Sequence, residues 1–76
     1  MIQKYHNSDT MILIPTNVPF VDKDLYTYEW YLDHNLIGCA YQVSCTFPRS
    51  KKYKITLIVS ASGYKTTTNR YVNVVL

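Results

Sequence analysis

Two runs of alternating polar and apolar residues constrain the fold of this chain more than any other feature of its sequence. The first run spans residues 26–33 and contains Trp30, the single tryptophan, and the second spans residues 53–59. A period of two places successive side chains on opposite faces of a β-strand, so each run can bury one face. The apolar positions are Tyr28, Trp30 and Leu32 in the first run and Tyr53, Ile55, Leu57 and Val59 in the second. We therefore expect two strands that share one core.

Composition supports a small folded β domain. Of the 76 residues, 47% are hydrophobic and 17% are charged, a balance that argues against disorder. Eight tyrosines and abundant Thr, Val and Ile favour strands. A chain of this length makes one domain, near the lower size at which a single apolar core suffices.

Turn-forming residues divide the chain into six or seven short strand candidates. The expected strands cover 10–14, 25–33, 36–39, 42–47, 52–60 and 64–76, with 18–21 as a brief edge segment, 61–63 as a turn and 1–9 as a flexible lead-in or edge strand. Short, regularly spaced strands without helical periodicity indicate an all-β sandwich or barrel. A parallel sheet is not expected, because no connection is long enough for a crossover. The prediction is an antiparallel β-sandwich of about seven strands that fills residues 10–76 as a single domain.

The pattern resembles a known family, the PKD domain, which is an immunoglobulin-like β-sandwich. The matching segments are Tyr28-Glu-Trp30-Tyr-Leu32-Asp33, Thr46-Phe47 before a turn, Tyr53-Lys-Ile55-Thr-Leu57-Ile-Val59-Ser60, Gly63, and the closing Tyr71-Val72-Asn-Val74. Two positions depart from the family pattern: residues 33–35 replace its Gly-Asp-Gly turn, and Lys51-Lys52 replaces a glycine. Trp30 and Tyr53 also resemble the core tryptophan and the tyrosine corner of ordinary immunoglobulin domains. The disulfide of those domains is missing, since residues such as Ile12 or Ile14 and Ile55 hold its expected positions. The PKD domain is therefore the favoured resemblance.

The resemblance implies a non-catalytic extracellular or cell-surface module that serves as a spacer, an adhesion unit or an accessory binding domain. Its expected partners are neighbouring domains or another protein, with carbohydrate as a further candidate, and it implies no cofactor. Two other functions stay open: a small immunoglobulin-like structural protein that decorates or assembles a virus or phage particle, and a basic β-barrel that binds nucleic acid. Residues 1–6 lack the apolar core of a signal peptide, but a domain cut from a secreted parent with an added Met would begin in the same way.

Charge and chemistry exclude most other functions. The net charge is +3, and Arg49, Lys51 and Lys52 around one turn do not form the basic stripe that nucleic acid requires. No apolar stretch approaches the roughly 18 residues of a membrane span, so no membrane insertion is expected. His6 and His34 have no neighbouring nucleophile in the sequence, and no phosphate-binding loop occurs, so we expect no enzyme activity.

The sequence gives little support for a metal site. Asp22, Asp24 and Asp33 lie in predicted turns that could share one end of the sandwich, where related domains sometimes bind calcium. Calcium needs six or more oxygen ligands, so solvated turns are the preferred interpretation.

Cys39 and Cys45 are six residues apart and share strand parity. On one continuous strand they would lie about 20 Å apart, whereas a turn near 41–43 would let them face each other and form a disulfide. A disulfide and two buried free thiols both remain open.

The outward faces of the strands offer a candidate interaction surface. If Trp30 points inward, parity sends Tyr31, Ile58, Tyr71 and Val75 to the opposite side. Gathered together, these four side chains would make an exposed apolar and aromatic patch for a protein partner. The alternative is ordinary cross-strand pairing on a tyrosine-rich sheet.

Overall fold

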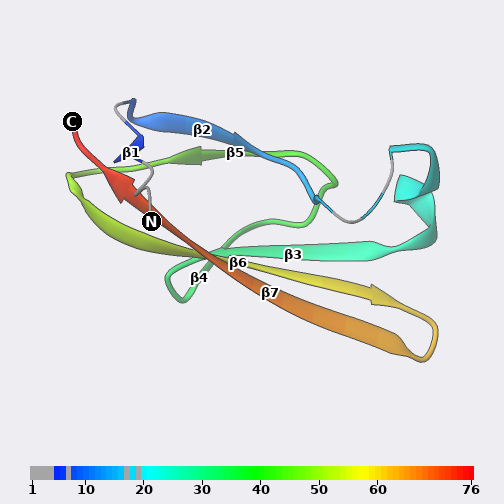
Figure 1. The fold of residues 1–76 in the computed structure, drawn as a ribbon. Helices are drawn as coiled ribbons and strands as arrows, with labels where there is room; N and C mark the ends of the chain where they lie inside the picture. Colours follow the sequence, from blue (N-terminus) through cyan, green and yellow to red (C-terminus); the bar gives the residue numbers. More distant parts are fainter. Residues whose placement is uncertain (1–4, 7, 17, 19) are drawn as a thin grey trace.

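The computed structural model describes residues 5–6, 8–16, 18 and 20–76, which form seven strands and one short 3-10 helix. The elements are β1 (Tyr5–His6), β2 (Thr10–Leu13), η1 (Phe20–Leu25), β3 (Thr27–Leu32), β4 (Asn35–Gly38), β5 (Val43–Thr46), β6 (Lys51–Ala61) and β7 (Tyr64–Val74). Figure 1 shows the small pair β2 and β5 lying over the long strands β3, β6 and β7. The described part of the chain is therefore all-β, as predicted, and no helix in it is long and apolar enough to cross a membrane.

The strands form two sheets of unequal size. One sheet has the order β1-β7-β6-β3-β4, and the other contains β2 and β5. All pairs are antiparallel except β1 and β7, which run parallel through Tyr5 opposite Asn73 and His6 opposite Val74. The expectation of a purely antiparallel fold is wrong for this pair. The crossover argument does not apply to it, because β1 and β7 lie at opposite ends of the described chain and the rest of the domain connects them.

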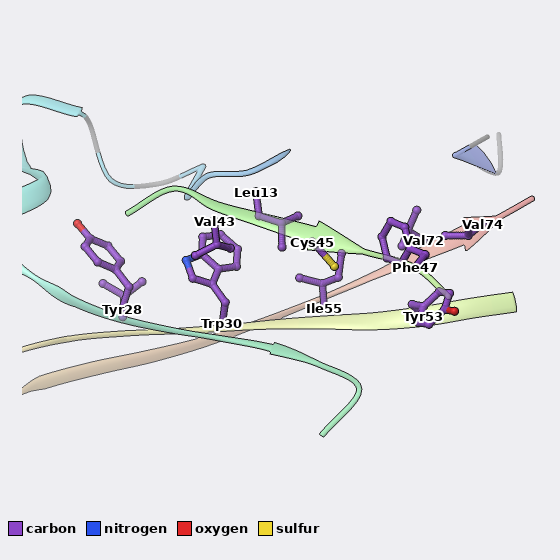
Figure 2. Close-up of a cluster of buried hydrophobic side chains, with 11 residues drawn as sticks. Leu13, Tyr28, Trp30, Val43, Cys45, Phe47, Tyr53, Ile55, Val72 and Val74 are labelled. Carbon is purple, nitrogen blue, oxygen red and sulfur yellow. The ribbon is translucent and has the colours of Figure 1, made fainter. Parts of the chain in front are cut away.

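The core forms where the two alternating runs meet. Trp30 lies opposite Leu57 and Tyr28 opposite Val59, so the two runs pair in one sheet. The prediction that they share one core is confirmed. The buried side chains are Leu13, Tyr28, Trp30, Val43, Cys45, Phe47, Tyr53, Ile55, Val59, Val72 and Val74. Figure 2 shows side chains of β2 and β5 pointing toward those of β3, β6 and β7 across the space between the sheets. The indole N–H of Trp30 donates to the Ala40 carbonyl at 2.9 Å, which satisfies its buried polar atom.

The first core strand is confirmed, but the side chains point differently from expectation. Leu13 is buried, while Ile12 and Ile14 are 56% and 52% exposed. The assignment of Ile12 or Ile14 to a core position is therefore wrong. A continuous apolar run gives no parity signal, so its inward residues are chosen only by the sheet against which the strand packs.

The segment before β3 also differs from the prediction. Residues 20–25 form the helix η1 instead of an edge segment followed by a turn, and Pro19 lies outside the described residues. The Tyr28 hydroxyl donates to the Lys23 carbonyl at 2.7 Å and ties this helix to β3. A short apolar run without clear periodicity cannot distinguish a strand from a helical turn.

Glycine suits its two positions in this chain for different structural reasons. Gly63 has φ of 70° in the two-residue turn between β6 and β7, a conformation that favours glycine. Gly38 lies at the end of β4, within the strand expected over 36–39, and an added Cβ there would approach Val43 Cγ1 to 2.6 Å. Its missing side chain thus allows the two sheets to come close together.

Candidate functional site

The outward face of β3, β6 and β7 is a surface that three paired strands present away from the core. Strand pairing arranges its side chains in rows across the sheet. These rows are Glu29, Ile58 and Thr67, then Tyr31, Thr56 and Asn69, then Lys54 and Tyr71. We call these eight residues the outer face.

The register does not join the four predicted contact residues into one apolar patch. Tyr31 and Ile58 are half-buried diagonal neighbours in adjacent rows. Tyr71 is 62% exposed, but the polar row of Thr56 and Asn69 separates it from Ile58. Val75, also exposed, lies just beyond the end of β7. The surface is a mixture of aromatic and polar groups, and its role in binding stays a prediction.

An open hollow of about 360 Å³ lies in this surface. Its lining residues are Tyr31, Asp33, His34, Lys54, Thr56, Thr67 and Asn69. At its base, the Thr56 hydroxyl donates to Asn69 Oδ1 at 2.7 Å. At its side, the Tyr31 hydroxyl donates to Glu29 Oε1 at 3.3 Å; burial and the nearby Glu29 carboxylate raise the pKa of Tyr31. The hollow is therefore lined by one aromatic ring and by several polar groups.

The turn between β6 and β7 predicts part of this hollow from the sequence, although strand parity alone does not. Thr56, Thr67 and Asn69 were not selected as site residues, yet a two-residue turn at Ser62 and Gly63 sets the register of the hairpin around it. Counting outward from the pair Ala61 and Tyr64 places Thr56 opposite Asn69. The contribution of Tyr31 requires the long-range pairing of β3 with β6, which no local turn determines.

Asp33 supports one end of the hollow. This residue has φ of 55° in the turn between β3 and β4, and its backbone N–H donates to the Lys54 carbonyl at 2.7 Å. Its carboxylate accepts hydrogen bonds from Lys51 Nζ at 3.0 Å and from the Lys54 backbone N–H at 3.1 Å. The Lys51 hydrogen bond, followed by the Lys54 N–H, holds the pKa of the Asp33 carboxyl below its ordinary value. Asp33 therefore anchors the turn to β6.

Lysine side chains make the outer face cationic around Tyr71. Lys52 Nζ lies 5.0 Å from the centre of the Tyr71 ring, a cation–π contact, and Lys54 is the cross-strand neighbour of Tyr71. Among the described residues, Lys51 and Asp33 form an ion pair, whereas the Lys54 ammonium has no carboxylate within 4.0 Å. Lys52 and Lys54 thus remain available to an anionic group.

Tyr53 fixes the loop between β5 and β6 at the edge of the core. Its hydroxyl donates to the Arg49 carbonyl at 2.8 Å and accepts from the Arg49 backbone N–H at 3.3 Å. This hydrogen bonding to backbone four residues upstream is the contact that the sequence predicted for a tyrosine corner. Phe47 packs on the Tyr53 ring with a centroid distance of 4.9 Å.

The two cysteines are free thiols in the structure, one exposed and one buried. The disulfide considered from the sequence is not formed, because β4 pairs with β3 in the large sheet while β5 pairs with β2 in the small sheet. Cys39 follows the first of these strands and Cys45 lies in the second. Burial among apolar side chains raises the pKa of the Cys45 thiol, so Cys45 acts as a core residue.

The three aspartates considered for calcium do not share one end of the fold. Asp22 and Asp24 lie in η1, before β3, whereas Asp33 follows the end of β3. Six strand residues separate the two sites by about 20 Å. Within the residues that the structure describes, no group of three or more His, Cys, Asp or Glu side chains could hold a metal ion.

A second, smaller cavity of about 100 Å³ opens at the side of the fold. It is lined by Pro15, Thr16, Val18, Tyr26, Leu57, Val59, Tyr64, Thr66 and Thr68. It arises because the β6–β7 hairpin reaches beyond the small sheet, as Figure 1 shows. This volume is below the roughly 300 Å³ at which small-molecule pockets begin, so the cavity is small for such a ligand.

A solved structure contains a similar arrangement within a larger protein. A quinoprotein alcohol dehydrogenase-like protein from Bacteroides thetaiotaomicron matches 95% of this chain with a TM-score of 0.72 at 12% sequence identity. The matched part is 17% of the length of that chain, and at this identity the likeness concerns the fold alone. No family profile and no curated protein matches the sequence.

Proposed function

We propose that this chain is a non-catalytic, immunoglobulin-like module of the PKD type that acts as a spacer, adhesion or interaction domain of a larger surface or secreted protein. The observation that carries the proposal is the placement of Trp30 and Tyr53 on two neighbouring strands of one sheet. Trp30 lies on β3 and packs under the small sheet, and Tyr53 hydrogen-bonds back to Arg49 at the start of β6. A core tryptophan and a tyrosine corner on neighbouring strands are typical of immunoglobulin-like domains.

The strand order gives further support. The sheet order β7-β6-β3-β4 places the last two strands beside the tryptophan strand, opposite a sheet made from an early and a middle strand. The corresponding immunoglobulin sheet has the last two strands beside the tryptophan strand in the same way.

The chemistry of the described residues supports a binding role over catalysis. His34 is an exposed turn residue, and the neighbouring Asp33 carboxylate is held by Lys51 and the Lys54 backbone. Neither group is paired with a Ser or Cys nucleophile among the described hydrogen bonds, as acyl or group transfer would require. The outer face instead presents Tyr71 to solvent between two lysines, and exposed aromatics are common at the energetic centres of interfaces.

Surface labelling of the gene product tests this proposal. The full-length product, tagged at its end, is expressed in its native cell and treated with a membrane-impermeant amine label or with external protease. We expect labelling or cleavage of this domain in intact cells, or its recovery from the medium. Protection in intact cells together with labelling after lysis would overturn the proposal, as would recovery of the protein only in purified virus or phage particles.

A further inference from the structure

The hollow of the outer face offers three kinds of group that are suited to one ligand. Tyr31 supplies a ring held in place by its hydrogen bond to Glu29. Asn69 uses its Oδ1 as the acceptor for Thr56, and within the described residues its amide N–H groups have no acceptor. Thr67 adds an exposed hydroxyl. An aromatic wall beside amide and hydroxyl groups fits a ring with both apolar faces and hydroxyl groups, which is the chemistry of a sugar.

The charges around the hollow favour an acidic ligand. The two acids near it are already engaged, since Asp33 is paired with Lys51 and Glu29 accepts from Tyr31. Lys54 lines the hollow without an ion-pair partner among the described residues, and Lys52 lies one row further along β6. A carboxylate or sulfate on the ligand would form a charge-assisted hydrogen bond with the Lys54 ammonium.

The same features argue against nucleic acid. Two unpaired lysines neutralise few phosphates, whereas nucleic-acid affinity comes mainly from many such contacts. Single-stranded nucleic acid also stacks its bases on several aromatic rings in succession. This hollow has one ring, Tyr31, because the exposed Tyr71 does not line it.

We propose that this hollow binds an acidic carbohydrate, with a sugar ring against Tyr31, its hydroxyl groups on Asn69 and Thr67, and its anionic group on Lys54. The inference rests on the proposed function as an extracellular binding module and gives that module a ligand class. The anionic group can be a uronate carboxylate or a sulfate, since both present the same charged oxygens to a lysine.

The test is native affinity electrophoresis of the domain in gels that contain alginate, heparin, neutral dextran or single-stranded DNA. We expect alginate, heparin or both to retard the domain, with no effect of dextran. Retardation by alginate alone identifies a uronate, and retardation by heparin alone identifies a sulfate. Retardation by DNA equal to that by both acidic polysaccharides, or no retardation by either polysaccharide, would refute the inference. The surface-labelling experiment is independent of these results, so the two proposals can fail separately.

Matched variants locate the site. Lys54→Gln removes one charge at the hollow, and Lys65→Gln removes one charge from β7 at the far end of the hairpin, paired with Ser60. Loss of a charged hydrogen bond predicts roughly tenfold weaker binding for Lys54→Gln, and no more than twofold for Lys65→Gln. Tyr31→Phe should retain binding and Tyr31→Leu should lose it, with thermal melting as the folding control. Equal weakening by the two lysine variants would show general charge attraction and overturn the assignment.

Discussion

Replacing Trp30 with alanine is the strongest test of the fold, because this side chain connects the two sheets. Trp30 is 4% exposed and packs beneath the small sheet. A buried tryptophan covers about 200 Å² of surface, which at about 25 cal/mol per Å² corresponds to roughly 5 kcal/mol. Measured aromatic-to-alanine changes in cores cost about 3 to 5 kcal/mol. The change also removes the hydrogen bond from the indole to the Ala40 carbonyl.

A domain of this length has a free energy of unfolding of about 4 to 11 kcal/mol, so Trp30→Ala should remove much or all of its stability. We expect a largely unfolded chain at 37 °C. The assay is urea and thermal unfolding followed by circular dichroism and tyrosine fluorescence, because the variant has no tryptophan left. Tyr71→Ala is the control, since this aromatic side chain is 62% exposed and should change stability by about 0.5 kcal/mol or less. If Trp30→Ala melted within a few degrees of the parent, the shared core would be refuted.

Three further changes test local features of the structure. Tyr53→Phe should cost about 1 kcal/mol in urea unfolding, because it removes the hydrogen bond to the Arg49 carbonyl, and an unchanged midpoint would show that the corner is not stabilising. Asp33→Asn should reduce the pH dependence of stability. The pKa of Asp33 is lowered in the folded protein, so its carboxylate stabilises the fold above the ordinary carboxyl pKa. This stabilisation is lost as the pH falls through the pKa that Asp33 has in the folded protein. The parent should therefore exceed this variant in melting temperature at pH 7, with a difference that shrinks below about pH 4. A constant difference between the parent and Asp33→Asn would contradict the ion pair with Lys51. Gly38→Ala should lower the free energy of unfolding by about 1 to 3 kcal/mol, because the added Cβ would clash with Val43. Combining it with Val43→Ala should relieve part of this loss of stability. If the losses from the two changes simply add in the double variant, the close approach of Gly38 and Val43 is contradicted.

Features with a local physical cause could be predicted from the sequence. Alternation in residues 26–33 and 53–59 identified β3 and β6 and the inward position of Trp30, because the period of a strand is fixed by its backbone. The turn before Tyr64 was also predicted, since glycine adopts positive φ readily there. The resemblance to immunoglobulin domains indicated Tyr53 as a tyrosine-corner candidate, and its hydroxyl donates to the Arg49 carbonyl.

Features that depend on which strands pair could not be predicted. The run 10–14 has apolar residues on both faces, so only packing against the large sheet buried Leu13 and left Ile12 and Ile14 outside. The assignment of β4 and β5 to different sheets, which leaves Cys39 and Cys45 as free thiols, is likewise a long-range choice.

The features of the candidate site can likewise be divided into those that the sequence determined and those that the tertiary structure decided. The sequence by itself determined that Tyr31, Ile58 and Tyr71 face away from the core, because parity follows from the inward Trp30 and Tyr53. Tertiary structure decided that Thr56 and Asn69 separate Tyr71 from Ile58, and that Lys54 and Tyr31 line a hollow together with Asn69. Parity is a property of each strand alone, whereas the neighbours of a side chain across a sheet depend on a register that is set by contacts between residues far apart in the chain.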